Sequence, residues 1–169
     1  MVLNRETVEI YAREINEPMT LELFLTAGLY GCNYQVGSRL AEALYFAPHF
    51  GKRLAGQQPG VRAGVSYISR IESAKHVSTW RDLEAVLSKE RGRVWWNGQS
   101  ELLKRLHTNW SWSTGEQRVF LLLNTPHLVF NPPIDKRNLV GGRGFLGKRF
   151  FSFEELFSAW DQPLGGEKE

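Results

Sequence analysis

The chain has 169 residues, 42% of them hydrophobic and 23% charged, which is the composition of an ordinary globular domain large enough to bury its own core. Its single cysteine, Cys32, excludes an internal disulfide and a cysteine-only zinc site, and no apolar run is long enough to span a membrane. A net charge of +3 is too small to indicate a histone-like polyanion binder. From the chain length we expect one domain, 1–169. Because the first residues lack a signal-peptide pattern, we expect this domain in the cytoplasm, with no membrane partner.

Residues 1–30 are predicted to form an N-terminal helical extension. Charged and apolar residues alternate from Glu6 to Ile15, a pattern that suits either a strand or an early helix, and Pro18 interrupts it. From Thr20 to Leu29 the apolar residues recur at nearly helical spacing and glycine is close by, so this stretch predicts a short amphipathic helix.

The middle of the chain alternates strand and helix patterns. Leu44–Phe50 predicts a strand whose proline places it at a sheet edge or makes it end there. Gly64–Val77 has the strongest strand pattern of the chain. Thr79, with Asp82 three residues later, forms a capping pair, which predicts a helix from Trp80 to Leu87.

A second helix and a hairpin are expected next. Arg93–Trp96 is interpreted as extended, and Gln99–His107 as a short helix with three leucines on one face. Arg118–Asn124 has strand length, and a turn containing proline follows it. His127–Phe130 then reads as the second strand of a hairpin, which Asn131–Pro133 should stop.

The C-terminal segment predicts a loop, a strand and a closing helix. Asp135–Gly147 combines four glycines with three cations and should be a mobile loop unless a ligand orders it. Arg149–Phe153 predicts a last short strand, and a capping box at Ser152 begins a helix that runs to Trp160. Residues 164–169 are predicted to be a frayed tail. The elements lack a regular βαβ order, so we expect an α+β fold with a curled antiparallel sheet or small β-barrel and short peripheral helices.

Charge is distributed unevenly along the chain. The segment Arg91–Arg149 contains ten Lys and Arg residues against three acids, whereas residues 1–30 and 150–169 are both acidic. Four of the six tryptophans lie in the same segment. Cations mixed with flat aromatic rings suit a polyanion with stackable bases, and therefore a nucleic acid. The alternative, a solvated basic face over an aromatic core, would produce the same pattern.

The candidate binding residues are cations in or beside glycine-rich loops and two adjacent tryptophans. Loop cations can act with backbone amides around a phosphate, and an exposed indole contributes about 1–3 kcal/mol per stacked base. In an extended segment the two indoles would face opposite sides, one inside and one outside. The candidates from the residues themselves are Lys52, Arg53, Arg143, Lys148, Arg149, Trp95 and Trp96.

The motifs of catalysis and metal binding are incomplete. Gly141–Lys148 resembles a phosphate loop in composition, but Arg149 stands where that motif needs Ser or Thr. The four histidines are scattered without metal-ligand spacing, and Cys32 is a lone thiol. We therefore predict no catalytic residues, no metal and no cofactor.

Three segments in this order resemble the PUA-like barrels of the EVE and ASCH type: Leu44–Pro48 followed by Gly64–Glu72, the Phe120–Phe130 region with its two prolines, and Lys148–Leu156. The resemblance covers residues 43–160. It implies a small β-barrel that binds RNA or DNA and in some cases receives a modified or flipped base in an aromatic pocket. For that pocket it suggests Tyr34 and Tyr67, together with Trp95 and Trp96.

The sequence therefore predicts a non-catalytic nucleic-acid-binding module, for example a modified-base reader or a subunit of a defence or nucleic-acid-processing assembly. One alternative is a protein-interaction subunit or inhibitor, since Trp, Tyr and Arg also dominate protein interfaces. A second alternative is an enzyme that acts on nucleic acid. The expected partners are DNA or RNA and a protein of a larger assembly.

Overall fold

The computed structural model describes residues 10–33, 43–110, 117–125, 127–140 and 150–162. Its seven strands are β1 (Ile10–Ile15), β2 (Leu29–Asn33), β3 (Tyr45–Phe50), β4 (Gly64–Val77), β5 (Arg118–Leu123), β6 (Leu128–Ile134) and β7 (Phe150–Phe151). Its helices are α1 (Pro18–Glu22), the π-helix η2 (Leu23–Ala27), α3 (Lys52–Gln57), α4 (Trp80–Arg91), α5 (Arg93–Gly98), α6 (Ser100–Asn109), α7 (Lys136–Val140) and α8 (Phe153–Asp161).

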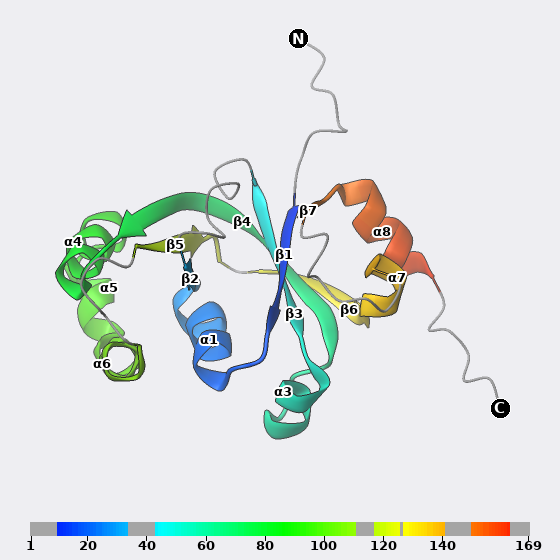
Figure 1. Ribbon diagram of the computed structural model, residues 1–169, viewed down its shortest axis with the longest axis horizontal. Helices are drawn as coiled ribbons and strands as arrows, with labels where there is room; N and C mark the ends of the chain where they lie inside the picture. The colour runs from blue at the N-terminus through cyan, green and yellow to red at the C-terminus, as the bar shows by residue number, and fades with distance from the viewer. Residues whose placement is uncertain (1–9, 34–42, 111–116, 126, 141–149, 163–169) are drawn as a thin grey trace, which may run out of the picture.

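The long strand β4 organises the sheet, whose order is β2-β5-β4-β3-β1-β7 (Figure 1). Its C-terminal half pairs with β5, and its N-terminal half pairs with β3 and with β6. The sheet curls, and among the described strands no pairing joins β2 to β7. The predicted α+β fold with a curled sheet and short helices is thus confirmed, although β1 and β3 run parallel.

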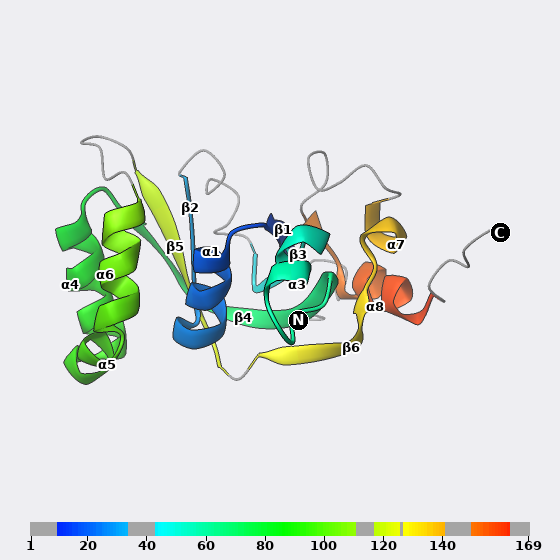
Figure 2. The same ribbon diagram turned by 90° about the horizontal axis from the view of Figure 1, so that it is seen from below.

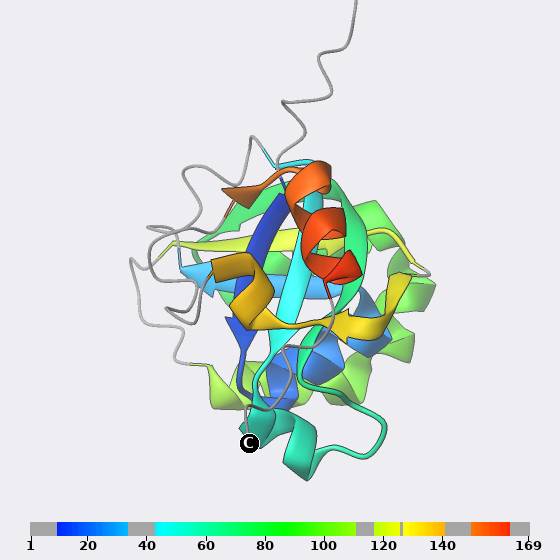
Figure 3. The ribbon, with the colours of Figure 1, turned by 90° about the vertical axis from the view of Figure 1, so that its right-hand side faces the viewer.

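Three apolar clusters hold the fold together. One cluster lies inside the curl and includes Tyr11, Phe24, Phe46 and Phe50. A second packs α8 against β6 and β1, and a third packs α4 and α6 against β5 and η2. Figures 1 and 2 accordingly show α4, α5 and α6 gathered at one end of the molecule, with α7 and α8 at the other. Figure 3 views the end that carries α7 and α8, with α3 at the lower edge.

The capping patterns predicted their helices correctly. Thr79 accepts a hydrogen bond from the amide of Asp82, and Ser152 accepts one from the amide of Glu155, and each acid reciprocates. The first capping box begins α4, which continues to Arg91, one turn beyond the predicted end at Leu87. The second begins α8, which ends at Asp161, one residue after the predicted end. The predicted helix after Thr20 is also present as α1 and η2, and it ends at Gly28, whose φ of 61° suits glycine.

The predicted hairpin is wrong. β5 pairs with β2 and β4, whereas β6 pairs with the other half of β4, so the two strands are not partners. Nor do the prolines end β6, which continues to Ile134. Asn131–Pro133 lies at a register shift in the pairing with β4, where a strand tolerates proline.

Two further expectations differ from the structure. Residues 10–33 are not a helical extension, because β1 and β2 are part of the sheet. The strand β3 lies between β1 and β4, so it is not at an edge. Its Pro48 is tolerated at a register shift in the pairing with β4. The predicted mobile loop begins with α7, and its remainder, like the tail 164–169, lies outside the described residues.

His127 ties the start of β6 to η2 and β4. Its ring stacks on Phe24 with centroids 4.1 Å apart, and Nε2 lies 3.0 Å from the Phe24 carbonyl oxygen. Since a carbonyl only accepts, Nε2 carries the proton and Nδ1 is free to accept from the Ser69 hydroxyl, with which it is in contact. Burial lowers the pKa of His127, and the hydrogen bond to Phe24 offsets only part of this effect.

We expect the free energy of unfolding to fall as the pH drops below about 6.5, the ordinary histidine pKa. The unfolded chain then binds a proton that the folded His127 still refuses, so stability is lost until the lowered folded pKa is passed. Urea unfolding of the wild type and of His127→Gln between pH 5 and 8 measures this. The variant should show a shallower slope by at most about one proton, and an unchanged slope would contradict the assignment.

Candidate functional site

A hollow of about 530 Å³ opens where the C-terminal ends of β1, β3 and β6 meet the start of β4. Four cations line it, contributed by α3, by the loop before β4 and by α7: Lys52, Arg62, Lys136 and Arg137. Glu14, Asp135 and His49 lie among them, and Pro132, Pro133 and three small residues complete the wall. We call this the cationic hollow. Its four positive charges against two negative ones favour an anionic ligand.

Local geometry brings these side chains together. β3 ends at Phe50, and Gly51 turns the chain so that Lys52 begins α3. A Cβ on Gly51 would lie 2.5 Å from Oδ1 of Asn16 and 3.3 Å from Oε1 of Glu14, so these side chains would have to shift to admit a larger residue between β1 and α3. On the opposite side, β6 ends at Ile134 and α7 begins at Lys136. Strand ends from distant parts of the chain therefore deliver the charges to one place.

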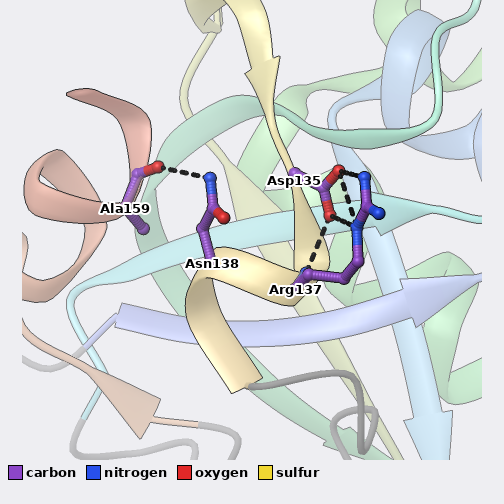
Figure 4. Close-up of polar contacts among 4 residues, drawn as sticks. All are labelled: Asp135, Arg137, Asn138 and Ala159. Carbon is purple, nitrogen blue, oxygen red and sulfur yellow. Dashed lines mark hydrogen bonds and ion pairs between the residues drawn. The ribbon is translucent and has the colours of Figure 1, made fainter. Parts of the chain in front are cut away.

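Asp135 fixes the rim of the hollow at the start of α7. Its carboxylate accepts from the guanidinium of Arg137 at 2.7 Å and from the Arg137 amide at 2.8 Å (Figure 4). The hydrogen bond from the Arg137 side chain is the main cause that lowers the pKa of Asp135. Asn138 donates to the Ala159 carbonyl at 3.2 Å and thereby fastens α7 to α8. Arg137 is thus held by an internal anion, whereas its exposed face can still meet a ligand.

Glu14 stands between a cation and a histidine in the wall. Oε2 of Glu14 lies 3.7 Å from Nζ of Lys136, and Oε1 lies 4.0 Å from Nδ1 of His49. His49 is only 5% exposed, and its burial lowers its pKa. The imidazole is therefore neutral at pH 7 in the free protein.

A smaller hollow of about 210 Å³, lined by both aromatic and polar residues, adjoins the cationic one and shares Arg62 and Pro133 with it. We call it the Tyr67 hollow, since Tyr67 lines it together with Phe50 and Phe130. Arg62 also donates to Oδ1 of Asn131 at 3.4 Å across its mouth. Within the described part of the chain, the buried Oγ of Ser66 has no hydrogen-bond partner. The hollow thus combines aromatic walls with a buried hydroxyl that lacks a hydrogen-bond partner among the described residues.

A third hollow, of about 360 Å³, lies between β1 and β2. Glu14 lines it as well, so it adjoins the cationic hollow. The guanidinium of Arg118 sits 4.4 Å above the Trp110 ring there, and Arg13 lies nearby. The Trp110 ring packs on Phe120 and remains partly exposed.

The structure brings together only part of the predicted site. Lys52 lines the cationic hollow, Arg53 is exposed beside it on α3, and Tyr67 lines the adjoining hollow. Trp95 and Trp96 lie on α5, at the end of the molecule away from α7 (Figure 1). The remaining predicted residues lie outside the described ranges: Tyr34, Arg143, Lys148 and Arg149.

Sequence reasoning missed three cations of the hollow. Arg62 stands in a loop between Gly60 and Gly64, and the rule that selected Lys52 would have selected it too. Lys136 and Arg137 belong to the basic segment Arg91–Arg149, whose composition does not single them out from its other cations. No local sequence pattern predicts that α7 and α3 line the same hollow, because their positions depend on the pairing of β6 with β4.

The interpretation of Trp95 and Trp96 as extended residues is wrong, because Arg93–Gly98 is helical. Both rings are half-buried and pack against the helical cluster, and Trp96 lies 5.9 Å from Trp80 between ring centroids. Successive residues of a helix are separated by only about 100°, so both can lean on one core.

We therefore expect Trp96→Ala to lower the free energy of unfolding by about 2–3 kcal/mol, because it removes a large packed ring. Urea unfolding measures this loss. Val94→Ala on the same helix is the control, since Val94 is 87% exposed and should cost almost nothing. Nucleic-acid affinity of the folded Trp96 variant should equal that of the wild type, and a large loss of affinity would restore the stacking role.

A solved structure of another protein has a similar fold. The chain is similar to the N-terminal domain of Staphylothermus marinus McrB, with a TM-score of 0.59 and 10% sequence identity. The match covers 94% of this chain and 95% of that chain. No protein-family model matches the sequence, and no curated protein matches it significantly. At this identity the likeness shows a shared fold.

None of the helices that the structure describes combines the length and apolar character that crossing a bilayer requires. Nor do the described ranges contain a group of three or more His, Cys, Asp or Glu residues placed to hold a metal ion.

Proposed function

We propose that this chain is a non-catalytic nucleic-acid-binding module whose cationic hollow receives backbone phosphates. The observation that carries the proposal is the convergence of Lys52, Arg62, Lys136 and Arg137 on one hollow from distant parts of the sequence. Phosphate contacts supply most of the affinity of such modules, and Arg and Lys are the residues that make them.

The adjoining Tyr67 hollow supports a finer assignment, a reader of an unstacked base. Its aromatic walls can pack on a base that leaves its stack, and the free hydroxyl of Ser66 can bond to a base edge. The resemblance to PUA-like barrels of the EVE and ASCH type agrees with this role. A modified base is the corresponding candidate ligand.

We further propose that the module works within a larger assembly of the defence or nucleic-acid-processing kind. Its support is the fold shared with the N-terminal domain of McrB, which is by its description one domain of a longer protein. DNA and RNA both fit the chemistry of the hollows, so the choice between them is left to experiment.

The test is a filter-binding panel of single- and double-stranded DNA and RNA, with and without base modification, at several salt concentrations. Since Arg137 and Lys136 are already paired with Asp135 and Glu14, we expect two to four phosphates to be neutralised. The logarithm of affinity should then fall against that of salt concentration with a slope of about −2 to −4. Absence of binding, or binding that salt does not weaken, would reject the proposal in favour of the protein-interaction alternative.

A further inference from the structure

His49 occupies an unusual position in the cationic hollow. It belongs to β3, is 5% exposed, and forms part of the wall of the hollow. Glu14 on β1, Lys136 on α7 and Asp135 after β6 act electrostatically on His49. Three further cations line the same hollow: Lys52 of α3, Arg62 of the loop before β4 and Arg137 of α7. An imidazole in this place responds to any charge that enters the hollow.

In the free protein the surroundings keep His49 neutral. Burial is the main cause that lowers its pKa, and Lys136 adds to the effect, whereas Glu14 and Asp135 oppose it. The negative charge of Glu14 cannot fully neutralise the positive charge of a protonated His49, because the second carboxylate oxygen of Glu14 lies 3.7 Å from the ammonium of Lys136. One carboxylate is thus shared between two potential cations.

We propose that His49 takes up a proton when an anion occupies the cationic hollow, so that the protein binds phosphate-bearing ligands more tightly as the pH falls through the neutral range. The identity of the ligand rests on the proposed function. The coupling itself concerns any anion in the hollow.

Two effects of the anion act in the same direction. Its negative charge stabilises the imidazolium directly, and the low exposure of His49 weakens the screening of that attraction. The anion also attracts the ammonium of Lys136, which leaves the carboxylate of Glu14 to compensate His49 at 4.0 Å. Because linkage is reciprocal, an anion that favours the proton is itself favoured by the proton. The limit for one proton is about tenfold in affinity per pH unit.

The first experiment titrates the histidine ring protons of the wild type by nuclear magnetic resonance, in sodium sulfate and in sodium chloride of equal ionic strength. Sulfate is the probe because it does not titrate between pH 5 and 8. The His49 midpoint should be higher in sulfate than in chloride. An equal midpoint for His49 in the two salts would overturn the proposal, whether or not nucleic acid binds.

The second experiment measures the affinity for a thymidine oligonucleotide without terminal phosphates at pH 6, 7 and 8. The wild type should bind more tightly at pH 6 than at pH 8. His49→Gln, which cannot be protonated, should bind with an affinity independent of pH, whereas His107→Gln should retain the dependence. If sulfate moves the His49 midpoint but no oligonucleotide binds, the coupling stands and the proposed function fails. If the oligonucleotide binds equally at every pH, the coupling is wrong and the function stands.

Discussion

Replacing Lys52, Arg62 and Lys136 together by alanine is expected to lower nucleic-acid affinity by about 100- to 1000-fold at moderate salt. Each of the three cations lines the cationic hollow, and each phosphate contact contributes on the order of tenfold. The slope of affinity against salt should also become shallower by about two to three, because fewer counterions are released. Titration of a labelled oligonucleotide at three salt concentrations measures both quantities.

This variant should remain folded. Lys52 and Arg62 are exposed, and the Lys136–Glu14 ion pair is partly solvated, so its loss should cost less than about 1 kcal/mol. The unfolding midpoint in urea should therefore stay close to that of the wild type.

The matched control removes the same number of charges elsewhere. Arg81, Lys89 and Lys104 are exposed on α4 and α6, at the end of the molecule away from the hollow (Figure 2). Their triple alanine variant should lose only the small part of affinity that depends on overall charge. If both triple variants lose affinity equally, the hollow is not the binding site.

The fold could be predicted where a few neighbouring residues decide the structure. The capping boxes at Thr79 and Ser152, and the alternation along Gly64–Val77, are local signals, and they gave α4, α8 and β4. The hairpin prediction was wrong because β6 could pair with either β5 or β4, and the residues between Asn124 and His127 do not determine which of the two strands it pairs with. Pairing between distant strands depends on the whole packed sheet, which a single stretch of sequence does not encode by itself.

The candidate site could likewise be predicted only where a local sequence pattern determines it. A cation beside a glycine turn is recognisable locally, and Lys52, which this pattern selects, lines the cationic hollow. That Arg62 and Lys136 face it, and that Trp95 and Trp96 do not, follows from strand order and from helix α5. Clustering along the sequence therefore proved a poor guide to clustering in space.

Gly64→Ala is expected to be the most destabilising single substitution beside the site, with a loss of about 3 kcal/mol or more in the free energy of unfolding. Gly64 has a φ of 114°, a conformation that side chains rarely adopt. A Cβ there would also lie 2.6 Å from the carbonyl oxygen of Ile134 and 3.1 Å from Cβ of Pro133. Urea unfolding of the purified variant measures the loss.

Gly60→Ala is the control for backbone strain without steric contact. Gly60 has a φ of 80°, but no atom lies within 4 Å of the Cβ that alanine would add, so it tests backbone strain alone. We expect a loss of about 1 kcal/mol. The larger loss expected for Gly64→Ala then combines its φ of 114° with the close approach of β4 and β6. Because this approach holds Pro133 and Arg62 at the boundary of the two hollows, any Gly64→Ala protein that remains folded should also bind nucleic acid more weakly. Equal losses of stability in the two variants would show that β6 can move away from β4, and that the hollows are less rigid than this packing implies.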